Sequence, residues 1–297
     1  MTVMPHAPRL SASPTRLAAG LLLALAALLL APVPPAHAAT FEVDTTVDDG
    51  ALSACTAAPN DCSLRGAINA AYASAGADTI TFGINGTFTL TGAAGDDANL
   101  SGDLDILKSA TSGDLTITGN GITNTILDGG GIDRVIDFNP GHVVSGVGLT
   151  LQGIRVTGGR VTGEGGGIRS WSSAAVVVIR DSLIDNNQTL GAYDGGGIYA
   201  DGLELTLWNT TVDSNSGTQG GGIASMTRDF NVSASTVSNN HATSSGGGVN
   251  AMGRGVTFTE TTISGNSAGR SGGGILTISP TLIVRTTVSN NAAGEFG

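Results

Sequence analysis

The sequence is poor in the residues on which most nucleic-acid-binding proteins depend. Only 12% of its 297 residues are charged and 4% are aromatic, and the chain contains a single lysine, Lys108. The formal net charge is −11. Because phosphate backbones are bound by clusters of lysine and arginine, this composition argues against nucleic acid and against an anionic membrane surface as partners.

Long hydrophobic runs are also missing, apart from one near the N-terminus. Leu17–Ala31 is apolar, follows Arg9 and Arg16, and precedes the small-x-small sequence Ala36-His37-Ala38. This order of segments is typical of a secretory signal peptide, which we place at residues 1–38. The run is short for a membrane span, so we expect an exported protein whose mature chain has no transmembrane helix.

The chain has only two cysteines, Cys55 and Cys62, and no histidine between Thr40 and Gly141. Two cysteines without a nearby histidine cannot build a structural zinc site. In an exported chain an even number of cysteines favours a disulfide over two free thiols. This short cross-link would contribute about 2 kcal/mol and would staple the N-terminal segment.

Glycine, in contrast, is abundant, with 46 residues, many of them in a recurring tetrad. A Gly-Gly-Gly-hydrophobic sequence begins at Gly165, Gly195, Gly220, Gly246 and Gly272, at steps of 30, 25, 26 and 26 residues. A repeat of this length is typical of a solenoid, in which each unit buries its apolar face against the next.

Each period carries the same order of residue types, counted from one asparagine. Apolar residues stand eight and three positions before it, and also ten before it except in the last period, where Thr281 stands; a Ser or Thr stands five before it. The asparagines are Asn187, Asn215, Asn240, Asn266 and Asn291. We expect their side chains to form a hydrogen-bonded ladder and their backbone to adopt a left-handed turn. We also expect the glycines to supply positive φ, and the variable stretch between asparagine and glycines to be a loop.

The alternation of apolar and polar residues in these periods predicts strands, and the fold class that follows is an all-β parallel β-helix. One amphipathic helix is expected before it, over Ser63–Ala73, after a strand at Thr40–Val43. Its apolar face would hold Leu64, Ala67, Ile68, Ala71 and Tyr72. We therefore place an N-terminal cap at residues 39–78 and the β-helix at 79–297, truncated in mid-coil because the period predicts another glycine triplet near residue 297.

The segment Asp61-Cys62-Ser63-Leu64-Arg65-Gly66-Ala67-Ile68 resembles the CSLREA motif of bacterial secreted proteins. The repeats resemble the Gly-Gly-Ala-Ile and Phe-x-x-Asn repeats of polymorphic outer membrane proteins. This resemblance implies a right-handed parallel β-helix exported to the cell surface or medium, and it implies no defined reaction.

The CSLREA motif has a glutamate where this chain has Gly66. A glutamate three residues after Ser63 would complete a capping box, so we expect Gly66→Glu to raise stability by about 1 kcal/mol.

Acidic residues are thinly spread in the repeats. Hydrolysis of a polysaccharide needs two carboxylates within about 10 Å. Asp181 and Glu260 occupy one column, but they lie three coils apart, at about 14 Å. We therefore expect no catalytic residues in these coils.

One segment is denser in oxygen ligands, which stand at alternate positions around Gly102. They are Asp97, Asn99, Ser101, Asp103 and Asp105. The pattern resembles the first nine residues of a calcium-binding loop, although Lys108 stands where a bidentate glutamate is expected. The two interpretations are a calcium site and a polar loop that leads into a strand.

Four aromatic residues are candidates for a glycan platform: Trp208, Trp171, Tyr193 and Tyr199. Exposed aromatic rings can stack on sugar rings, and the alternative is ordinary packing at the corners of the coils. Trp208 is expected to project outward beside Arg180 and Ser233.

These observations favour an exported, non-catalytic β-helix with an adhesin-like role at the bacterial cell surface, associated with the outer membrane. One alternative is a carbohydrate-active β-helix that cleaves polysaccharide, as a lyase or glycoside hydrolase, or binds glycan. A second is a secreted structural or matrix protein. The expected partners are extracellular glycans or the surface of a host or neighbouring cell.

Overall fold

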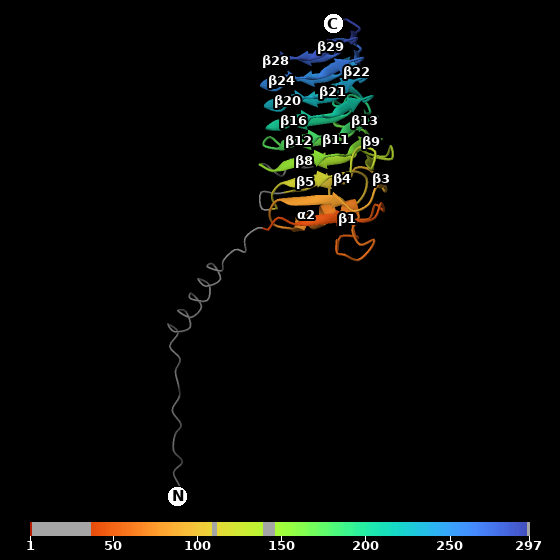
Figure 1. Cartoon of the computed structure of the whole chain (residues 1–297), viewed down its shortest axis with the longest axis vertical. Helices are drawn as coiled ribbons and strands as arrows, with labels where there is room; N and C mark the ends of the chain where they lie inside the picture. Colours follow the sequence, from red (N-terminus) through yellow and green to blue (C-terminus); the bar gives the residue numbers. More distant parts are fainter. Residues whose placement is uncertain (2–36, 109–111, 139–145, 296–297) are drawn as a thin grey trace. The chain divides into compact units, whose positions relative to one another are not determined.

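The computed structural model describes Met1 and residues 37–108, 112–138 and 146–295. The expected signal peptide, residues 1–38, lies almost entirely outside these ranges. The unit His37–Gly297 is a parallel β-helix, and its described part contains one α-helix, α2 (Leu64–Ala73). The predicted fold class is confirmed (Figure 1). No helix in the described ranges is long and apolar enough to cross a membrane.

Four parallel sheets run along the stack of coils. The nine-stranded sheet comprises β1 (Thr40–Val43), β2 (Asp78–Phe82), β5 (Leu115–Thr118), β8 (Gly148–Gln152), β12 (Val176–Arg180), β16 (Glu204–Trp208), β20 (Asp229–Ser233), β24 (Gly255–Thr259) and β28 (Thr281–Val284). The eight-stranded sheet comprises β3 (Gly86–Thr89), β6 (Thr125–Asp128), β9 (Arg155–Thr157), β13 (Leu183–Asp185), β17 (Thr211–Asp213), β21 (Thr236–Ser238), β25 (Thr262–Ser264) and β29 (Thr287–Ser289).

The other two sheets complete each coil. The seven-stranded sheet comprises β4 (Leu104–Ile106), β7 (Ile136–Phe138), β11 (Ile168–Trp171), β15 (Ile198–Asp201), β19 (Ile223–Ser225), β23 (Val249–Ala251) and β27 (Ile275–Thr277). The six-stranded sheet comprises β10 (Arg160–Val161), β14 (Gln188–Thr189), β18 (Ser216–Gln219), β22 (His241–Ser245), β26 (Ser267–Ala268) and β30 (Ala292–Ala293). This last sheet corrects one expectation, because the stretch after each asparagine begins as a short strand and not as a loop.

The core consists of columns of apolar side chains that continue from coil to coil. Val237 of β21 is fully buried and pairs in register with Ile263 of β25, which in turn pairs with Val288 of β29. The rings of Phe230 in β20 and Phe258 in β24, two register positions apart, make an edge-to-face contact with 6.0 Å between ring centres. Val288 is 48% exposed, because the described chain covers it on one side only. Burial of each coil therefore depends on its neighbours.

The asparagine ladder is confirmed. Each side-chain Nδ2 donates to the Oδ1 of the next asparagine at 2.9 to 3.0 Å, and each backbone N–H donates to the same oxygen. The left-handed turn, however, falls one residue earlier than expected, at Asn186, Ser214, Asn239, Gly265 and Asn290. The ladder side chain has to point into the corner, so the sharp turn is made by the residue before it.

The glycine triplets have two separate roles, and the expectation that all three supply positive φ is wrong. Only the first glycine does so, as in Gly195 at 69°. The second and third allow neighbouring coils to approach closely. A Cβ on Gly196 would lie 2.4 Å from the carbonyl oxygen of Gly221, and one on Gly197 would lie 2.7 Å from that of Gly222.

The N-terminal cap packs on the first coils, with α2 and β1 at the opposite end of the stack from β28 and β29 (Figure 1). The expected disulfide between Cys55 and Cys62 is present. Ser63 is the N-cap of α2, and its Oγ accepts a hydrogen bond from the Gly66 N–H at 2.9 Å. Tyr72 does not belong to the apolar face of the helix, since its side chain is 52% exposed.

The expectation that glutamate at position 66 would stabilise the helix is wrong. Gly66 is buried against the chain at Leu52, and a Cβ added at Gly66 would lie 1.8 Å from the Leu52 carbonyl oxygen. Glycine is required there by the close approach of two backbones.

Candidate functional site

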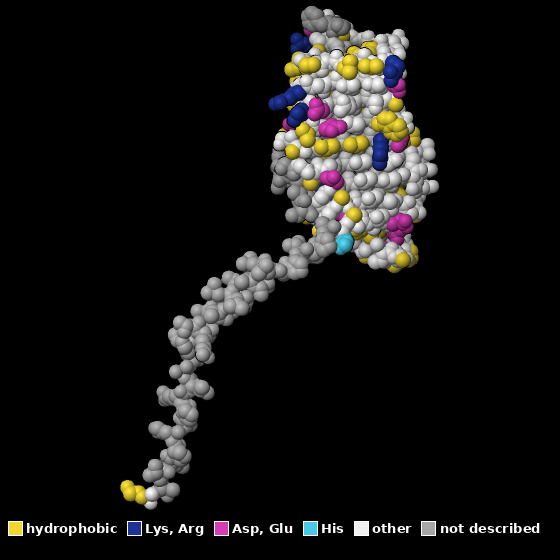
Figure 2. Space-filling model, turned by 60° about the vertical axis from the view of Figure 1, so that its left-hand side comes forward, with side chains coloured by type: hydrophobic (Ala, Val, Ile, Leu, Met, Phe, Trp, Pro, Cys, Tyr) yellow, Lys and Arg dark blue, Asp and Glu magenta, His cyan; other side chains and the backbone are white. Residues whose placement is uncertain are grey.

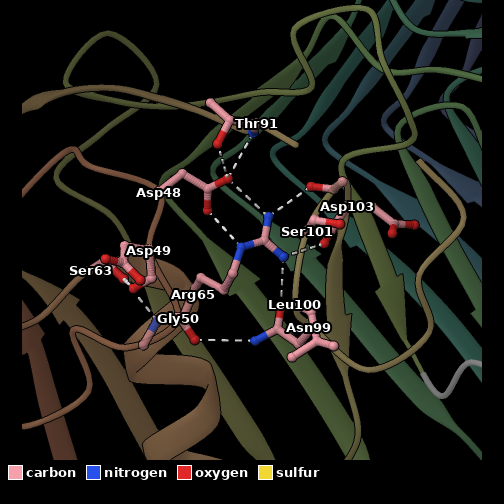
Figure 3. Close-up of polar contacts among 12 residues, drawn as sticks. Asp48, Asp49, Gly50, Ser63, Arg65, Thr91, Asn99, Leu100, Ser101 and Asp103 are labelled. Atoms are coloured by element: carbon pink, nitrogen blue, oxygen red, sulfur yellow. Dashed lines mark hydrogen bonds and ion pairs between the residues drawn. The ribbon is translucent and has the colours of Figure 1, made fainter. Parts of the chain in front are cut away.

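The polar centre of the N-terminal cap is the guanidinium of Arg65, which is buried on α2 (Figure 3). Its Nε donates to Asp48 Oδ1 at 2.7 Å, and one terminal nitrogen donates to Asp48 Oδ2 at 3.1 Å. The remaining donors reach Asn99 Oδ1 and the carbonyl oxygens of Gly102 and Asp103. All five N–H groups of the side chain therefore have acceptors, which ties the helix to the segment that carries the predicted calcium ligands.

Residues 91–103, which carry all of these predicted ligands except Asp105 of β4, are called the covering segment. Its ends meet through a hydrogen bond from Gly102 N–H to the Thr91 carbonyl at 2.9 Å. Within it, the carboxylate of Asp96 accepts the N–H groups of Ala98, Leu100 and Ser101. Burial acts to raise the pKa of Asp96, but these backbone hydrogen bonds outweigh it and lower the pKa overall. Asp96 is thus used to shape the segment.

The covering segment lies over acidic side chains that project outward from the seven-stranded sheet. Asp105 of β4 pairs in register with Asp137 of β7, and Asp137 pairs with Arg169 of β11. Arg169 binds Asp137 through two nitrogens, with Nε to Oδ1 at 3.0 Å. One terminal nitrogen of Arg134 donates hydrogen bonds to Asp137 Oδ2 and to Asp103 Oδ2, each at 2.8 Å. Two arginines thus pair with two buried carboxylates, those of Asp103 and Asp137, and Asp105 has no arginine partner among the described ion pairs.

Asp103 and Asp105 are unusually placed for charged groups, because they are at most 1% exposed. Burial raises the pKa of Asp105 to about 8 and that of Asp103 to about 7, since removal from water penalises the charged form. In each side chain Oδ2 has a protein partner, whereas the buried Oδ1 has none among the residues that the structure describes. An unpartnered buried carboxylate oxygen is costly, so these atoms call for a ligand.

The structure brings together only part of the predicted calcium loop. Carboxylate oxygens of Asp97, Asp105 and Asp137 all lie within 4.8 Å of one another. Asn99 and Ser101 are engaged elsewhere: Asn99 Oδ1 accepts from Arg65 and from Asp105 N–H, and Ser101 Oγ donates to the Ala93 carbonyl. Other members of the predicted loop thus hold the covering segment in place.

Sequence reasoning missed Asp137, Arg134 and Arg169. Asp137 and Arg169 each stand between two buried residues of their strands, where an outward-facing charge is expected to meet solvent. The sequence spacing could have revealed this pair. Asp137 and Arg169 lie 32 residues apart, which is close to one period, and they occupy equivalent positions in their strands. An alignment of the irregular early coils with the later repeat would therefore have placed these opposite charges next to each other.

The four aromatic candidates do not form one surface. Trp208 ends β16 in the nine-stranded sheet, is 48% exposed, and pairs in register with Arg180 and Ser233 as expected. Trp171 and Tyr199 belong to the seven-stranded sheet. The Arg169 guanidinium lies 5.0 Å from the Trp171 ring centre, and Tyr199 is only 7% exposed. Tyr193 lies in the turn that precedes β15, where its carbonyl accepts from Thr189 Oγ1.

The hollow nearest the covering segment has a volume of about 320 Å³ and is open to solvent. It is lined by Ala94, Gly95, Gly131, Ile132, Asp133, Arg160, Val161, Thr162 and Leu190. Its one acid, Asp133, accepts hydrogen bonds from the N–H groups of Gly95 and Arg134. This hollow therefore does not offer the pair of carboxylates that glycoside hydrolysis requires.

Asp181 and Glu260 are separated, as the sequence predicts, whereas Asp185 and Asp213 are register partners on adjacent strands, with Asp185 held by Arg155. Asp181 accepts a hydrogen bond from Asn209 in the next coil at 2.7 Å, and Glu260 forms an ion pair with Arg285 at 2.6 Å.

Comparisons with protein-family models, with curated protein sequences and with solved structures gave no match.

Proposed function

We propose that this chain is an exported, non-catalytic β-helix that presents an extended surface to extracellular partners, in an adhesin-like role at or near the bacterial cell surface. The parallel β-helix supports the proposal, because stacked coils repeat side chains at about 4.8 Å along flat walls. Such walls suit the binding of long polymers or of another cell's surface.

The observation that carries the proposal is the placement of the acidic groups. Of the four carboxyl groups that gather at the covering segment, those of Asp103, Asp105 and Asp137 are at most 1% exposed, and that of Asp97 is exposed. Asp103 and Asp137 are also paired with arginines. Buried carboxylates cannot reach the glycosidic bond of a polymer bound outside, and exposed Asp97 has no second exposed carboxylate beside it in this group. The arrangement therefore favours a structural role over general acid–base catalysis.

The surface agrees with this interpretation. On the face shown in Figure 2, acidic and basic side chains are scattered among uncharged ones and do not gather into a single charged patch. Recognition by such a wall would depend on shape, on Ser, Thr and Asn hydroxyl and amide groups, and on a few exposed apolar side chains.

The exposed side chain of Trp208 favours a glycan as the extracellular partner. Its ring is 48% exposed on a flat sheet, between Arg180 and Ser233 of the neighbouring coils. An exposed aromatic ring flanked by hydrogen-bonding groups is a suitable stacking surface for a sugar.

The test is a binding assay with the labelled mature chain on immobilised polysaccharides and on intact bacterial and animal cells. The proposal predicts saturable binding to at least one of these surfaces. Trp208→Ala should weaken glycan binding at least tenfold, whereas Leu282→Ala, which removes another exposed side chain of the same sheet, should not. Absence of saturable binding on every surface would contradict the proposal.

A further inference from the structure

The acidic group beneath the covering segment has the geometry of a cation site. Asp105 and Asp137 are register partners on adjacent strands, so their outward side chains are stacked one coil apart. Asp97 approaches them from the covering segment, and one oxygen of each residue lies within 4.8 Å of the others. Opposite ligands of a calcium ion are about 4.6 to 5.2 Å apart, since each Ca–O distance is about 2.3 to 2.6 Å.

A second observation points to a ligand at the same place. Asp105 is 1% exposed, and its Oδ2 already accepts the Asn99 N–H at 2.9 Å. Its Oδ1 is buried and has no hydrogen-bond partner in the described chain. Buried carboxylate oxygens are normally paired with a donor or a metal, so a cation would satisfy the one atom that the protein leaves unsatisfied.

The charges around the site leave an excess of acid. Arg134 and Arg169 face four carboxylates, those of Asp97, Asp103, Asp105 and Asp137, while Arg65 is committed to Asp48. The described ion pairs give neither Asp97 nor Asp105 a basic partner. Asp97 is exposed and Asp105 is buried, and together they offer two carboxyl groups without a basic partner, which a divalent cation would bind.

From this geometry we infer that Asp97, Asp105 and Asp137 bind one Ca²⁺ ion, which clamps the covering segment onto the seven-stranded sheet. Asp97 is exposed, so the ion has a route from solvent and water can complete its coordination shell. Asp105 and Asp137 supply the buried, rigid side of the site. The ion joins the covering segment to two successive coils, as a cross-link would.

The experiment is a calorimetric titration of the chelator-treated, full-length mature chain with CaCl₂, followed by thermal unfolding with and without the ion. The expected result is one Ca²⁺ per chain with a dissociation constant of about 1 mM or tighter, and a higher Tm with calcium. Mg²⁺ at the same concentration should raise the Tm less, because it demands shorter ligand distances.

The decisive variant is Asp97→Asn, since Asp97 is exposed and its loss should leave the calcium-free Tm unchanged. It should weaken calcium binding at least tenfold. Asp229→Asn, which removes an exposed acid from β20, is the matched control and should bind calcium as the natural chain does. Binding weaker than about 1 mM, or unchanged binding in Asp97→Asn, would overturn the inference.

Discussion

At the residue scale, Gly66 shows how a local rule is overridden by a tertiary contact. Helix-capping rules favour glutamate at this position, but the Leu52 carbonyl occupies the space that any side chain would need. We predict that Gly66→Ala lowers the free energy of unfolding by about 2 kcal/mol, within the range for overpacking, and that Gly66→Glu lowers it further. Urea denaturation measures both.

The matched control for Gly66 is Gly255→Ala. A Cβ at Gly255 would meet no atom closer than 3.8 Å, and its φ is not positive. This substitution should change the stability by less than about 1 kcal/mol. Equal effects of Ala at the two positions would show that the close approach at Leu52 does not constrain the cap.

The ladder asparagine Asn240 carries a second prediction at this scale. Its Oδ1 accepts hydrogen bonds from the backbone N–H and from the side-chain Nδ2 of Asn215. Its Nδ2 donates to Asn266 Oδ1 and to the Val212 carbonyl. Asn240→Ala would leave these buried groups without partners, at a cost of roughly 3 kcal/mol. Asn231→Ala, on the outward face of β20, should cost under about 1 kcal/mol in the same denaturation experiment. A similar loss in both variants would contradict a structural role for the ladder.

At the scale of elements, the docking of α2 depends on the only lysine. Lys108 Nζ is buried, donates to the Ala71 carbonyl at 2.8 Å, and forms an ion pair with Asp78 Oδ2 at 2.7 Å. Lys108 therefore joins the C-terminal half of the helix to the first residue of β2.

We predict that Lys108→Met lowers the free energy of unfolding by about 3 to 5 kcal/mol, because it leaves the buried Asp78 carboxylate without its cation. The double variant Lys108→Met/Asp78→Asn should recover part of this loss. Chemical denaturation of the natural chain and the variants gives both values. A double variant less stable than the single one would mean that the Asp78 carboxylate is held by its hydrogen bonds from Ala39 N–H and Ser74 Oγ and does not depend on the lysine.

The elements also show how far the sequence could be interpreted. The strands of the later coils and the asparagine ladder were predictable, because residues equivalent to Val237 and Asn240 recur at the same positions in every period. The acid cluster was only partly predictable. Asp97 and Asp105 lie in one suggestive segment, but Asp137 joins them only through the stacking of irregular early coils, whose period the glycine triplets do not mark. Likewise, the contact between Gly66 and Leu52 depends on how the chain before α2 packs against the helix. No local sequence pattern specifies that packing.

At the scale of the whole molecule, the β-helix behaves as a one-dimensional stack, so the cost of a core substitution should depend on its coil. Val237 is fully buried between coils, whereas Val288, two coils further along the same column, is 48% exposed. We predict that Val237→Ala costs about 2 kcal/mol and Val288→Ala less than about 1 kcal/mol in global unfolding. Equal costs would indicate that the column is not built coil upon coil as described.

The central claim for the whole molecule is that this surface binds extracellular partners and does not cut them. The most direct measurement is the release of new reducing ends and of unsaturated uronates when the purified mature chain is incubated, with calcium, with a panel of neutral and acidic polysaccharides. The account predicts no release above buffer over a period in which binding reaches saturation. Release of chain ends in proportion to the amount of protein added would contradict it.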